Sequence, residues 1–305
     1  MKGTEMKKIK VIVIAGPTAS GKSDLAMDLA EQYHGELISA DSLQVYQQLD
    51  IGTAKASEEE LKRGPQHLID IVPFDADYSV AEFVEDADKA IAEVASRGKV
   101  PIIVGGTGFY IKALLGQQQL DFAPSVAEEV AIDQKKDLKD LVQELKGSAD
   151  ADLVNRVDLN NKSRVIRALQ IARHGIKEDV TVRPQYDSLV LAIDWPREVL
   201  YERINQRVHT MVEKGLEKEA RLLYNAGGIN LQAGRGIGYK EFYPYFDGNL
   251  SLEQVIADIQ QDSRRYAKRQ LTYWRHQIDG LEWINGENRV VEATTHVHDF
   301  LLNKE

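Results

Sequence analysis

A glycine-rich run near the start of the chain has the pattern of a phosphate-binding loop. The pattern G-x-x-x-x-G-K-[ST] is matched by Gly16-Pro-Thr-Ala-Ser-Gly-Lys-Ser23. In such a loop, successive backbone N–H groups form an anion nest, the lysine reaches the terminal phosphates, and the last hydroxyl can hold Mg²⁺. Ser23 is the expected metal ligand. The residues expected to bind a di- or triphosphate are Gly16, Pro17, Thr18, Ala19, Ser20, Gly21, Lys22 and Ser23.

Two further stretches offer polar groups directly after apolar segments. Asp41 follows the segment 36–40, and the run Gly105-Gly-Thr-Gly108 follows the segment 100–104. A carboxylate in this position could ligate Mg²⁺, accept a proton from a nucleophile, or cap the next helix. Glycines let the backbone approach a ligand closely, and Thr107 adds a hydroxyl, although the same run also suits a tight turn. These groups are candidates to complete a site around the bound phosphate.

Basic residues gather in two places in the second half of the chain. Arg203 and Arg207 are spaced i, i+4, so they share one face of a helix and could neutralise a leaving diphosphate. The stretch 264–275 holds five basic residues and no acidic one. At 100° per residue, Arg265, Lys268, Arg269 and Arg275 fall within about 120° of the helix surface, opposite an apolar face. The cationic face suits RNA phosphates, while the commoner role of such a stripe is a solvated helix surface.

The elements that must position these groups alternate between strands and helices. The first strand ends at the phosphate-binding loop, and helical periodicity begins directly after it, which is the context the loop requires. Such alternation predicts an α/β core, a parallel sheet with helices on both faces. The predicted strands are 10–16, 36–40, 100–104 and 189–193. The predicted helices include 80–97, one from Pro196 toward Gly215, and one from Ser251 to about Arg275.

The strand pattern stops between Leu120 and Ile176, where acidic, lysine-bearing helical segments follow one another. This indicates a small helical domain inserted into the core. The predicted division is a core formed by 1–119 and 187–305, and an inserted domain formed by 120–186.

Composition excludes several classes of protein. The chain has 305 residues, 43% of them hydrophobic and 28% charged, as in folded globular proteins. The absence of cysteine excludes a disulfide framework, a thiolate zinc site and a cysteine nucleophile. The longest apolar run, Val11 to Ala15, is too short for a membrane span. A net charge of −10 argues against non-specific nucleic-acid coating but leaves room for a local basic patch. We expect a cytoplasmic monomer without membrane contact.

Seven blocks of the sequence together resemble the tRNA dimethylallyltransferase family, also called tRNA isopentenyltransferases. The resemblance covers nearly the whole chain and keeps the order of the blocks. The blocks are Gly16-Pro-Thr-Ala-Ser-Gly-Lys-Ser23, Ile38-Ser-Ala-Asp-Ser-Leu-Gln-Val-Tyr46, Asp50-Ile-Gly-Thr-Ala-Lys55, Gly105-Gly-Thr-Gly-Phe-Tyr110, Ser163-Arg-Val-Ile-Arg-Ala-Leu169, Gly236-Ile-Gly-Tyr-Lys-Glu241 and Lys268-Arg-Gln-Leu-Thr-Tyr-Trp-Arg275.

The resemblance implies transfer of a dimethylallyl group from dimethylallyl diphosphate to N6 of the adenosine next to the tRNA anticodon, with Mg²⁺ as cofactor. It implies that the α/β core is of the P-loop NTPase type and that the inserted domain closes over the anticodon stem-loop. It also implies that Asp41 is the general base and that Thr107 and Arg207 are further catalytic groups. The residues that it implies for tRNA binding are Asp41, Ser42, Leu43, Gln44, Ser163, Arg164, Arg167, Arg235, Lys240, Lys268, Arg269 and Arg275.

Three other functions share the phosphate-binding loop. A small-molecule kinase would bind ATP and carry arginines on a mobile lid, whereas the basic residues here lie on a long C-terminal helix. A transferase that prenylates free AMP or ATP would have no need of the basic stretch 264–275. A non-catalytic RNA-binding ATPase would tolerate the loss of Asp41.

Overall fold

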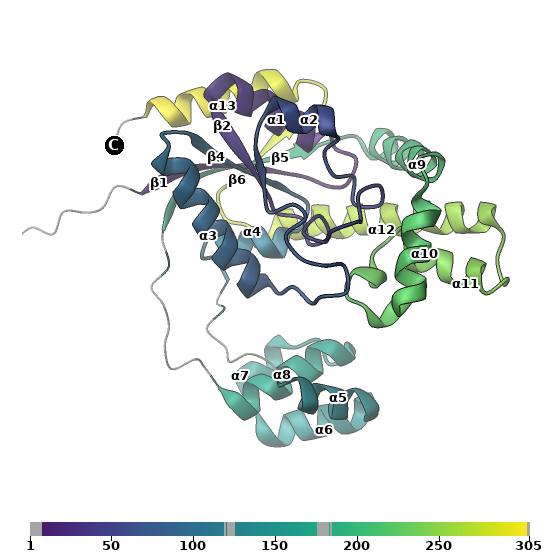
Figure 1. Cartoon of the computed structure of the whole chain (residues 1–305). Helices are drawn as coiled ribbons and strands as arrows, with labels where there is room; N and C mark the ends of the chain where they lie inside the picture. The colour runs from purple at the N-terminus through teal and green to yellow at the C-terminus, as the bar shows by residue number, and fades with distance from the viewer. Residues whose placement is uncertain (1–7, 119, 121–125, 176–182, 184, 304–305) are drawn as a thin grey trace, which may run out of the picture. The chain divides into compact units, whose positions relative to one another are not determined.

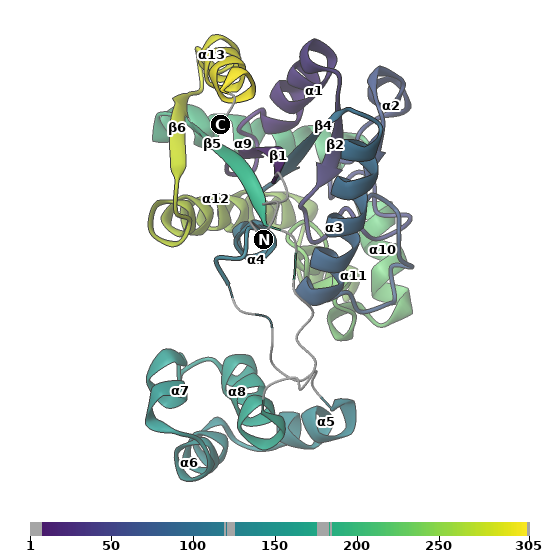
Figure 2. The same cartoon turned by 90° about the vertical axis from the view of Figure 1, so that its left-hand side faces the viewer.

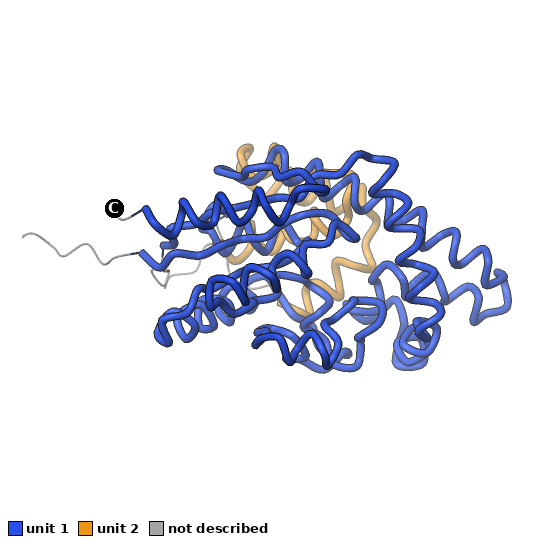
Figure 3. Tube along the Cα trace, turned by 90° about the horizontal axis from the view of Figure 1, so that it is seen from above, with its two compact units in different colours: residues 1–118, 184–305 blue, residues 119–183 orange. Residues whose placement is uncertain are grey.

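The computed structural model describes residues 8–303, apart from 119, 121–125, 176–182 and 184 (Figure 1). The chain folds into two compact units, residues 1–118 with 184–305 and residues 119–183 (Figure 3). These ranges differ by one to three residues from the division predicted above, 1–119 with 187–305 and 120–186. Gln119, the predicted end of the first core segment, lies outside the described residues.

The first unit is built on a six-stranded sheet in the order β3-β2-β4-β1-β5-β6, and every neighbouring pair is parallel. The prediction of a parallel α/β core is therefore confirmed. The central position of β1 explains its apolar run, because Val11 to Ala15 are covered on both sides and fully buried. The strands are β1 (Ile9–Ala15), β2 (Gly35–Ser39), β3 (Gln66–His67), β4 (Val100–Gly105), β5 (Tyr186–Asp194) and β6 (Leu281–Asn285).

Helices cover both faces of this sheet. Figure 2 shows α1 (Lys22–Tyr33) and α13 (Arg289–Leu302) on one face and α3 (Val80–Ser96) on the other. On the first face, Ile12 and Ile14 pack with Leu25 in one buried cluster. The other helices of the unit are α2 (Glu58–Arg63), α4 (Gly108–Leu114), α9 (Arg197–Glu213), α10 (Leu216–Ala226), α11 (Tyr243–Phe246) and α12 (Leu252–Gln277). Three 3₁₀ turns lie at Gly228–Asn230, Ala233–Arg235 and Lys240–Phe242.

The sequence patterns did not predict the two edge strands, nor the helices α2, α10, α11 and α13. β3 has only two residues, too few for any periodicity to be read. In β6 only Ile284 is buried, so the segment lacks the apolar run of an inner strand. The four strands that were predicted lie within three residues of the observed bounds, because each is a buried apolar run flanked by small or polar residues.

The second unit consists of α5 (Ala127–Lys135), α6 (Leu138–Ser148), α7 (Ala151–Arg156) and α8 (Lys162–His174). Leu141 and Leu145 of α6 pack against Val165 and Leu169 of α8 in a core of its own. Beside this core, Arg173 donates to the buried Asp133 at 2.8 Å. The unit therefore has both an apolar core and an internal charge pair.

Among the described residues, the structure contains no helix with the length and apolarity needed to cross a bilayer.

Candidate functional site

The loops predicted to do chemistry meet at one edge of the sheet. Ala15 of β1 pairs with Gly105 of β4, and Ser39 of β2 pairs with Val104, so these three strands end side by side. The phosphate-binding loop, the loop that begins at Asp41 and the run from Gly105 to Gly108 follow these ends. In open parallel sheets this is the edge at which ligands bind.

The phosphate-binding loop is shaped by left-handed backbone and supported from behind. Gly21 has a φ of +84° and caps α1, whose first N–H groups have no helical acceptor and face the loop as an anion site. The loop's own carbonyls are held elsewhere. The Trp195 indole donates to the Ser20 carbonyl at 2.9 Å, and the Arg203 guanidinium donates to the Ala19 carbonyl at 2.8 Å. These two bonds occupy carbonyls of the loop and hold it against β5 and α9.

Two cations lie within electrostatic reach of one another at this loop. Lys22 is half-buried and donates to the Pro17 carbonyl at 3.3 Å. Burial lowers the pKa of Lys22 to about 8, with the nearby Arg207 adding to the shift and Asp41 opposing it. Burial also lowers the pKa of Arg207, again against the influence of Asp41. Two cations that are desolvated and mutually repulsive favour the entry of a polyanion.

Asp41 lies between the phosphate-binding loop and the turn after β4. Its carboxylate accepts the Leu43 backbone N–H at 2.9 Å, and it lines a pocket together with Lys22, Ser23 and Gly105. Thr107 lies beside it, because the Thr107 hydroxyl accepts the backbone N–H of Ser42 at 3.2 Å. The tertiary structure thus gathers four of the side chains predicted for chemistry at this edge: Lys22, Ser23, Asp41 and Thr107.

Tyr266 of α12 also belongs to this group. Burial raises the pKa of Tyr266 to about 12, with Asp41 adding to the shift and the Thr107 hydroxyl and Arg269 opposing it. At 100° per residue, Tyr266 falls on the apolar face of this helix, opposite the basic residues, which the sequence pattern assigns to packing. That assignment is incomplete, because this face packs against the polar loops at the sheet edge as well as against the core.

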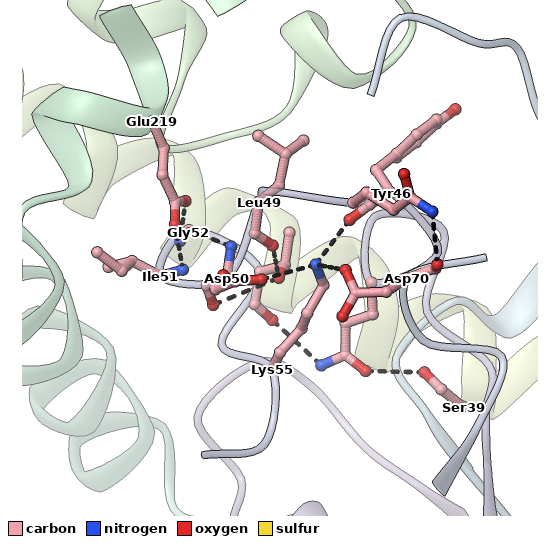
Figure 4. Close-up of polar contacts among 12 residues, drawn as sticks. Ser39, Tyr46, Leu49, Asp50, Ile51, Gly52, Lys55, Asp70 and Glu219 are labelled. Carbon is pink, nitrogen blue, oxygen red and sulfur yellow. Dashed lines mark hydrogen bonds and ion pairs between the residues drawn. The ribbon is translucent and has the colours of Figure 1, made fainter. Parts of the chain in front are cut away.

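The segment from Gln44 to Lys55 forms a wall of the pocket that Asp41 also lines. Figure 4 shows polar contacts that hold this wall in place. The Lys55 ammonium, with a side chain only 4% exposed, contacts Asp50 at 2.9 Å and Asp70 at 2.5 Å. The Glu219 carboxylate of α10 accepts three successive backbone N–H groups, those of Asp50, Ile51 and Gly52, at 2.7 to 3.0 Å. Two charged side chains therefore fix this segment from opposite sides.

Several residues predicted to contact tRNA are engaged within the protein. The Gln44 amide accepts from the Ser39 hydroxyl at 2.8 Å and donates to the carbonyls of Thr53 and Ala54. Leu43 packs close to Gly236, where an added Cβ would lie 3.0 Å from its side chain. The side chains of Leu43 and Gln44 thus support the wall. Any contact of these two residues with RNA would have to use atoms that are not engaged in these interactions.

The cationic stripe of α12 is divided between exposed and engaged residues. Lys268 and Arg269 are exposed, and the Arg269 guanidinium lies 5.7 Å from the Tyr266 ring centroid. Arg264 is tied to α9 by a 2.6 Å hydrogen bond to Asn205, and Arg275 lies 3.7 Å from Asp194. Arg265 pairs with Asp262 at 3.3 Å. Lys268 and Arg269 are therefore the cations best placed to receive phosphates.

The remaining residues predicted for tRNA binding belong partly to the first unit and partly to the second. Arg235 is exposed and donates to the Ile229 carbonyl at 3.0 Å, and Lys240 pairs with Asp262 at 3.1 Å. Ser163, Arg164 and Arg167 belong to α8 of the second unit, with the first two exposed and the third half-buried.

Sequence patterns missed two residues that support the site, Glu219 and Gln270. Arg203 was expected to help neutralise a leaving diphosphate, and in the structure it donates to the Ala19 carbonyl of the phosphate-binding loop. Glu219 carried no signal in the sequence. Gln270 could have been found, because it is a polar residue on the otherwise apolar face of α12. It is 6% exposed and bonds both to the phosphate-binding loop and to Gly106.

Comparison with known proteins gives the family of the chain. A family model described as IPP transferase matches residues 44–277. The chain belongs to the IPP transferase family. A tRNA dimethylallyltransferase from Leuconostoc citreum is 56% identical over 292 residues, which is 96% of this chain and 99% of that protein. The family model begins at Gln44, so the phosphate-binding loop and Asp41 precede the matched range, whereas the Leuconostoc alignment spans nearly the whole length.

Solved structures of the family share this fold. The full-length tRNA isopentenylpyrophosphate transferase of Bacillus halodurans has a TM-score of 0.73 and 37% identity, with 97% of each chain covered. A eukaryotic dimethylallyltransferase, whose structures are described as snapshots of its action on tRNA, has a TM-score of 0.82 and 28% identity. That match covers 97% of this chain and 80% of the other. The core of this IPP transferase is therefore the P-loop-like core of its relatives.

Proposed function

We propose that the protein transfers a dimethylallyl group from dimethylallyl diphosphate to N6 of the adenosine next to the anticodon of tRNA, releasing diphosphate. One observation carries the proposal. A half-buried carboxylate, Asp41, shares a pocket with the lysine and serine of a phosphate-binding loop. The groups proposed to bind the donor diphosphate and the carboxylate proposed to take a proton from the acceptor therefore lie at the same edge of the sheet. The names of the relatives support tRNA as the acceptor.

The donor diphosphate is proposed to lie in the phosphate-binding loop, residues 16–23. Its negative charge would be neutralised by Lys22 and Arg207, the two cations whose pKa values are lowered by burial. This stabilisation matters most as the allylic carbon–oxygen bond breaks, when charge builds on the leaving group. The site residues proposed for the donor are Gly16, Pro17, Thr18, Ala19, Ser20, Gly21, Lys22, Ser23 and Arg207.

The donor set at the loop suits Mg²⁺. No cluster of three or more His, Cys, Asp or Glu side chains that could cage a metal is found among the described residues. Mg²⁺ prefers few protein ligands, substrate phosphates and water, and the exposed Ser23 hydroxyl lies where the diphosphate would bind. We propose that Ser23 holds the ion, which when bound supplies further positive charge to the diphosphate oxygens.

Asp41 is proposed to act as the general base. The adenine N6 amine is a weak nucleophile because its lone pair is delocalised into the ring. As the N6–C1 bond forms and the C1–O bond to diphosphate breaks, the N6 proton passes to the Asp41 carboxylate. Thr107, whose hydroxyl holds the backbone next to Asp41, keeps the carboxylate in place. Charge and atoms balance, with N6-dimethylallyladenosine in the tRNA, diphosphate and protonated Asp41 as the immediate products.

The tRNA is proposed to reach this edge along α12, with the inserted domain, residues 120–186, as a second contact. The target base must leave its stack to enter the pocket, which costs a few kcal/mol and least in a single-stranded loop. Phosphate contacts can offset this cost. Lys268 and Arg269 are the leading contacts, and the proposed set also includes Ser42, Leu43, Gln44, Ser163, Arg164, Arg167, Arg235, Lys240 and Arg275. Action on tRNA favours a cytoplasmic location.

The experiment that tests the proposal is incubation of the protein with dimethylallyl diphosphate, Mg²⁺ and undermodified tRNA, followed by mass analysis of the nucleosides. We expect an adenosine heavier by one dimethylallyl group, located beside the anticodon. Parallel reactions with free AMP and with radiolabelled ATP test the rival functions. Prenylated AMP would indicate a transferase for free nucleotides, and a phosphorylated product would indicate a kinase.

Replacing Lys268 with alanine is expected to weaken tRNA binding about five-fold at moderate salt, because an exposed phosphate contact is lost. The plot of log affinity against log salt should become shallower by about one unit. Filter binding across a salt series measures both quantities. Lys89→Ala, which removes an exposed lysine of α3, is the matched control and should leave the slope unchanged. An unaltered slope for Lys268→Ala would exclude this residue from the interface.

A further inference from the structure

The side-chain amide of Gln270 bridges two loops of the site. Its carbonyl oxygen accepts the backbone N–H of Thr18 at 3.0 Å, and its amino group donates to the Gly106 carbonyl at 2.8 Å. Thr18 lies in the phosphate-binding loop after β1, and Gly106 lies in the turn after β4. One side chain from α12 therefore uses both ends of its amide to hold the two loops together.

The Gln270 side chain that forms this bridge is buried and closely packed. Gln270 is 6% exposed, and an added Cβ on Gly106 would lie 2.5 Å from its amino group. One turn later on α12, the ring of Tyr273 packs against Gly108 so closely that a Cβ there would lie 2.5 Å from the ring. The close approach of α12 thus explains Gly106 and Gly108, because a larger residue at either position would collide with it.

The other side of the same helix is the cationic one. Lys268 and Arg269 precede Gln270 by two residues and one residue, and both are exposed. Successive positions on an α-helix are rotated by 100°, so the cations point away from the face that carries the amide. The same segment of α12 therefore contacts the phosphate-binding loop through Gln270 and presents the exposed cations Lys268 and Arg269 in other directions.

We propose that Gln270 is a positioning residue for the diphosphate site, and that through it the tRNA-contacting helix and the donor site form one rigid unit. The inference deepens the proposed function and rests on it for the identity of the donor. The bridge needs one donor and one acceptor, which an amide provides and neither a carboxylate nor an apolar chain does. Without it, the Thr18 backbone and the Gly106 turn lose their common support.

The test compares diphosphate and tRNA binding in variants of the full-length protein. Gln270→Met keeps the length of the side chain and removes both hydrogen bonds. We expect the dissociation constant for inorganic diphosphate with Mg²⁺, measured by calorimetry, to rise about ten-fold. The dissociation constant for tRNA, measured without donor, should stay within two-fold. In turnover assays the KM for dimethylallyl diphosphate should rise while the KM for tRNA does not.

Gln270→Glu is the second variant and retains the acceptor for Thr18. It places a carboxylate against the Gly106 carbonyl and near the incoming anion, so diphosphate binding should weaken at least as much as in Gln270→Met. Thermal melts show whether each variant is folded, and the carboxylate variant serves as the test if Gln270→Met is not.

Gln260→Met is the matched control. Gln260 lies on the same helix, is half-buried and donates at 3.4 Å to the Asn205 carbonyl of α9, with no hydrogen bond to the phosphate-binding loop among the described residues. Its loss should leave diphosphate binding within two-fold. Unchanged diphosphate binding in both folded Gln270 variants, or an equal loss in Gln260→Met, would overturn the inference. Failure of the wild-type protein to prenylate tRNA would overturn the proposed function and leave the diphosphate measurement standing.

Discussion

Asp41→Asn is expected to slow the chemical step by about 10² to 10⁴-fold, the usual contribution of a positioned general base. The amide keeps the size of the side chain, and its oxygen can still accept the Leu43 N–H that the carboxylate accepts at 2.9 Å. What is lost is the capacity to take the N6 proton. Single-turnover transfer to undermodified tRNA measures the step directly.

The affinities of Asp41→Asn for dimethylallyl diphosphate and for tRNA should show whether Asp41 acts as a base or supports the structure. The carboxylate lies near Lys22 and Arg207 and opposes the lowering of their pKa values. Removing its charge leaves these cations with less internal compensation, so the affinity for dimethylallyl diphosphate should be equal or higher. The affinity for tRNA should change less than two-fold. A parallel loss of donor binding and rate would contradict the assignment of Asp41 as the base.

Asp24→Asn provides the control for that experiment. Asp24 lines the same pocket, is exposed and lies in the first turn of α1, where it complements the helix dipole. Its replacement should cost little activity, so a large effect at position 41 alone would identify a specific chemical role.

Lys22→Met is expected to lower kcat/KM for dimethylallyl diphosphate by about 10² to 10³-fold, because it removes a cation that we propose stabilises the leaving group. The same lysine predicts the pH dependence of donor capture. Since burial and Arg207 lower its pKa to about 8 in the free protein, the charged fraction falls above that pH. Donor kcat/KM should therefore decline as pH rises through about 8, and the decline should be absent from the methionine variant.

The contribution of Lys22 to the stability of the unliganded protein should rise with pH, whereas donor kcat/KM falls with pH. The folded protein holds the pKa of Lys22 at about 8, against an ordinary value of 10.5, so between these values the unfolded chain binds more protons. Stability from this group then rises with pH across that window and is reduced below it, where the lysine is charged in both states. Lys22→Met should leave the thermal midpoint of the free protein at neutral pH equal or higher. A marked fall would indicate that Lys22 stabilises the fold.

Local spacing was sufficient to locate the chemistry-bearing loops. The run Gly16-Pro-Thr-Ala-Ser-Gly-Lys-Ser23 follows a strand and opens a helix in the structure, as predicted. Asp41 and Thr107 were placed after the second and third predicted strands, and parallel strands bring such ends to one edge. The predicted roles of Asp41, Thr107 and Arg207 remain proposals that the experiments above test.

The alternating core, the phosphate-binding loop, the inserted helical segment and the family resemblance could all be recognised from the amino-acid sequence. These features depend on residues close together in the chain, where side-chain periodicity reports burial directly. The long-range partners of these residues could be identified from the folded structure alone. Gln270 bonds to Gly106 across 164 positions, and Glu219 holds Asp50 across 169. Contacts between residues so far apart in the chain depend on strand order and helix docking, which no local pattern encodes. The residues that support the site could therefore be identified only from the folded structure.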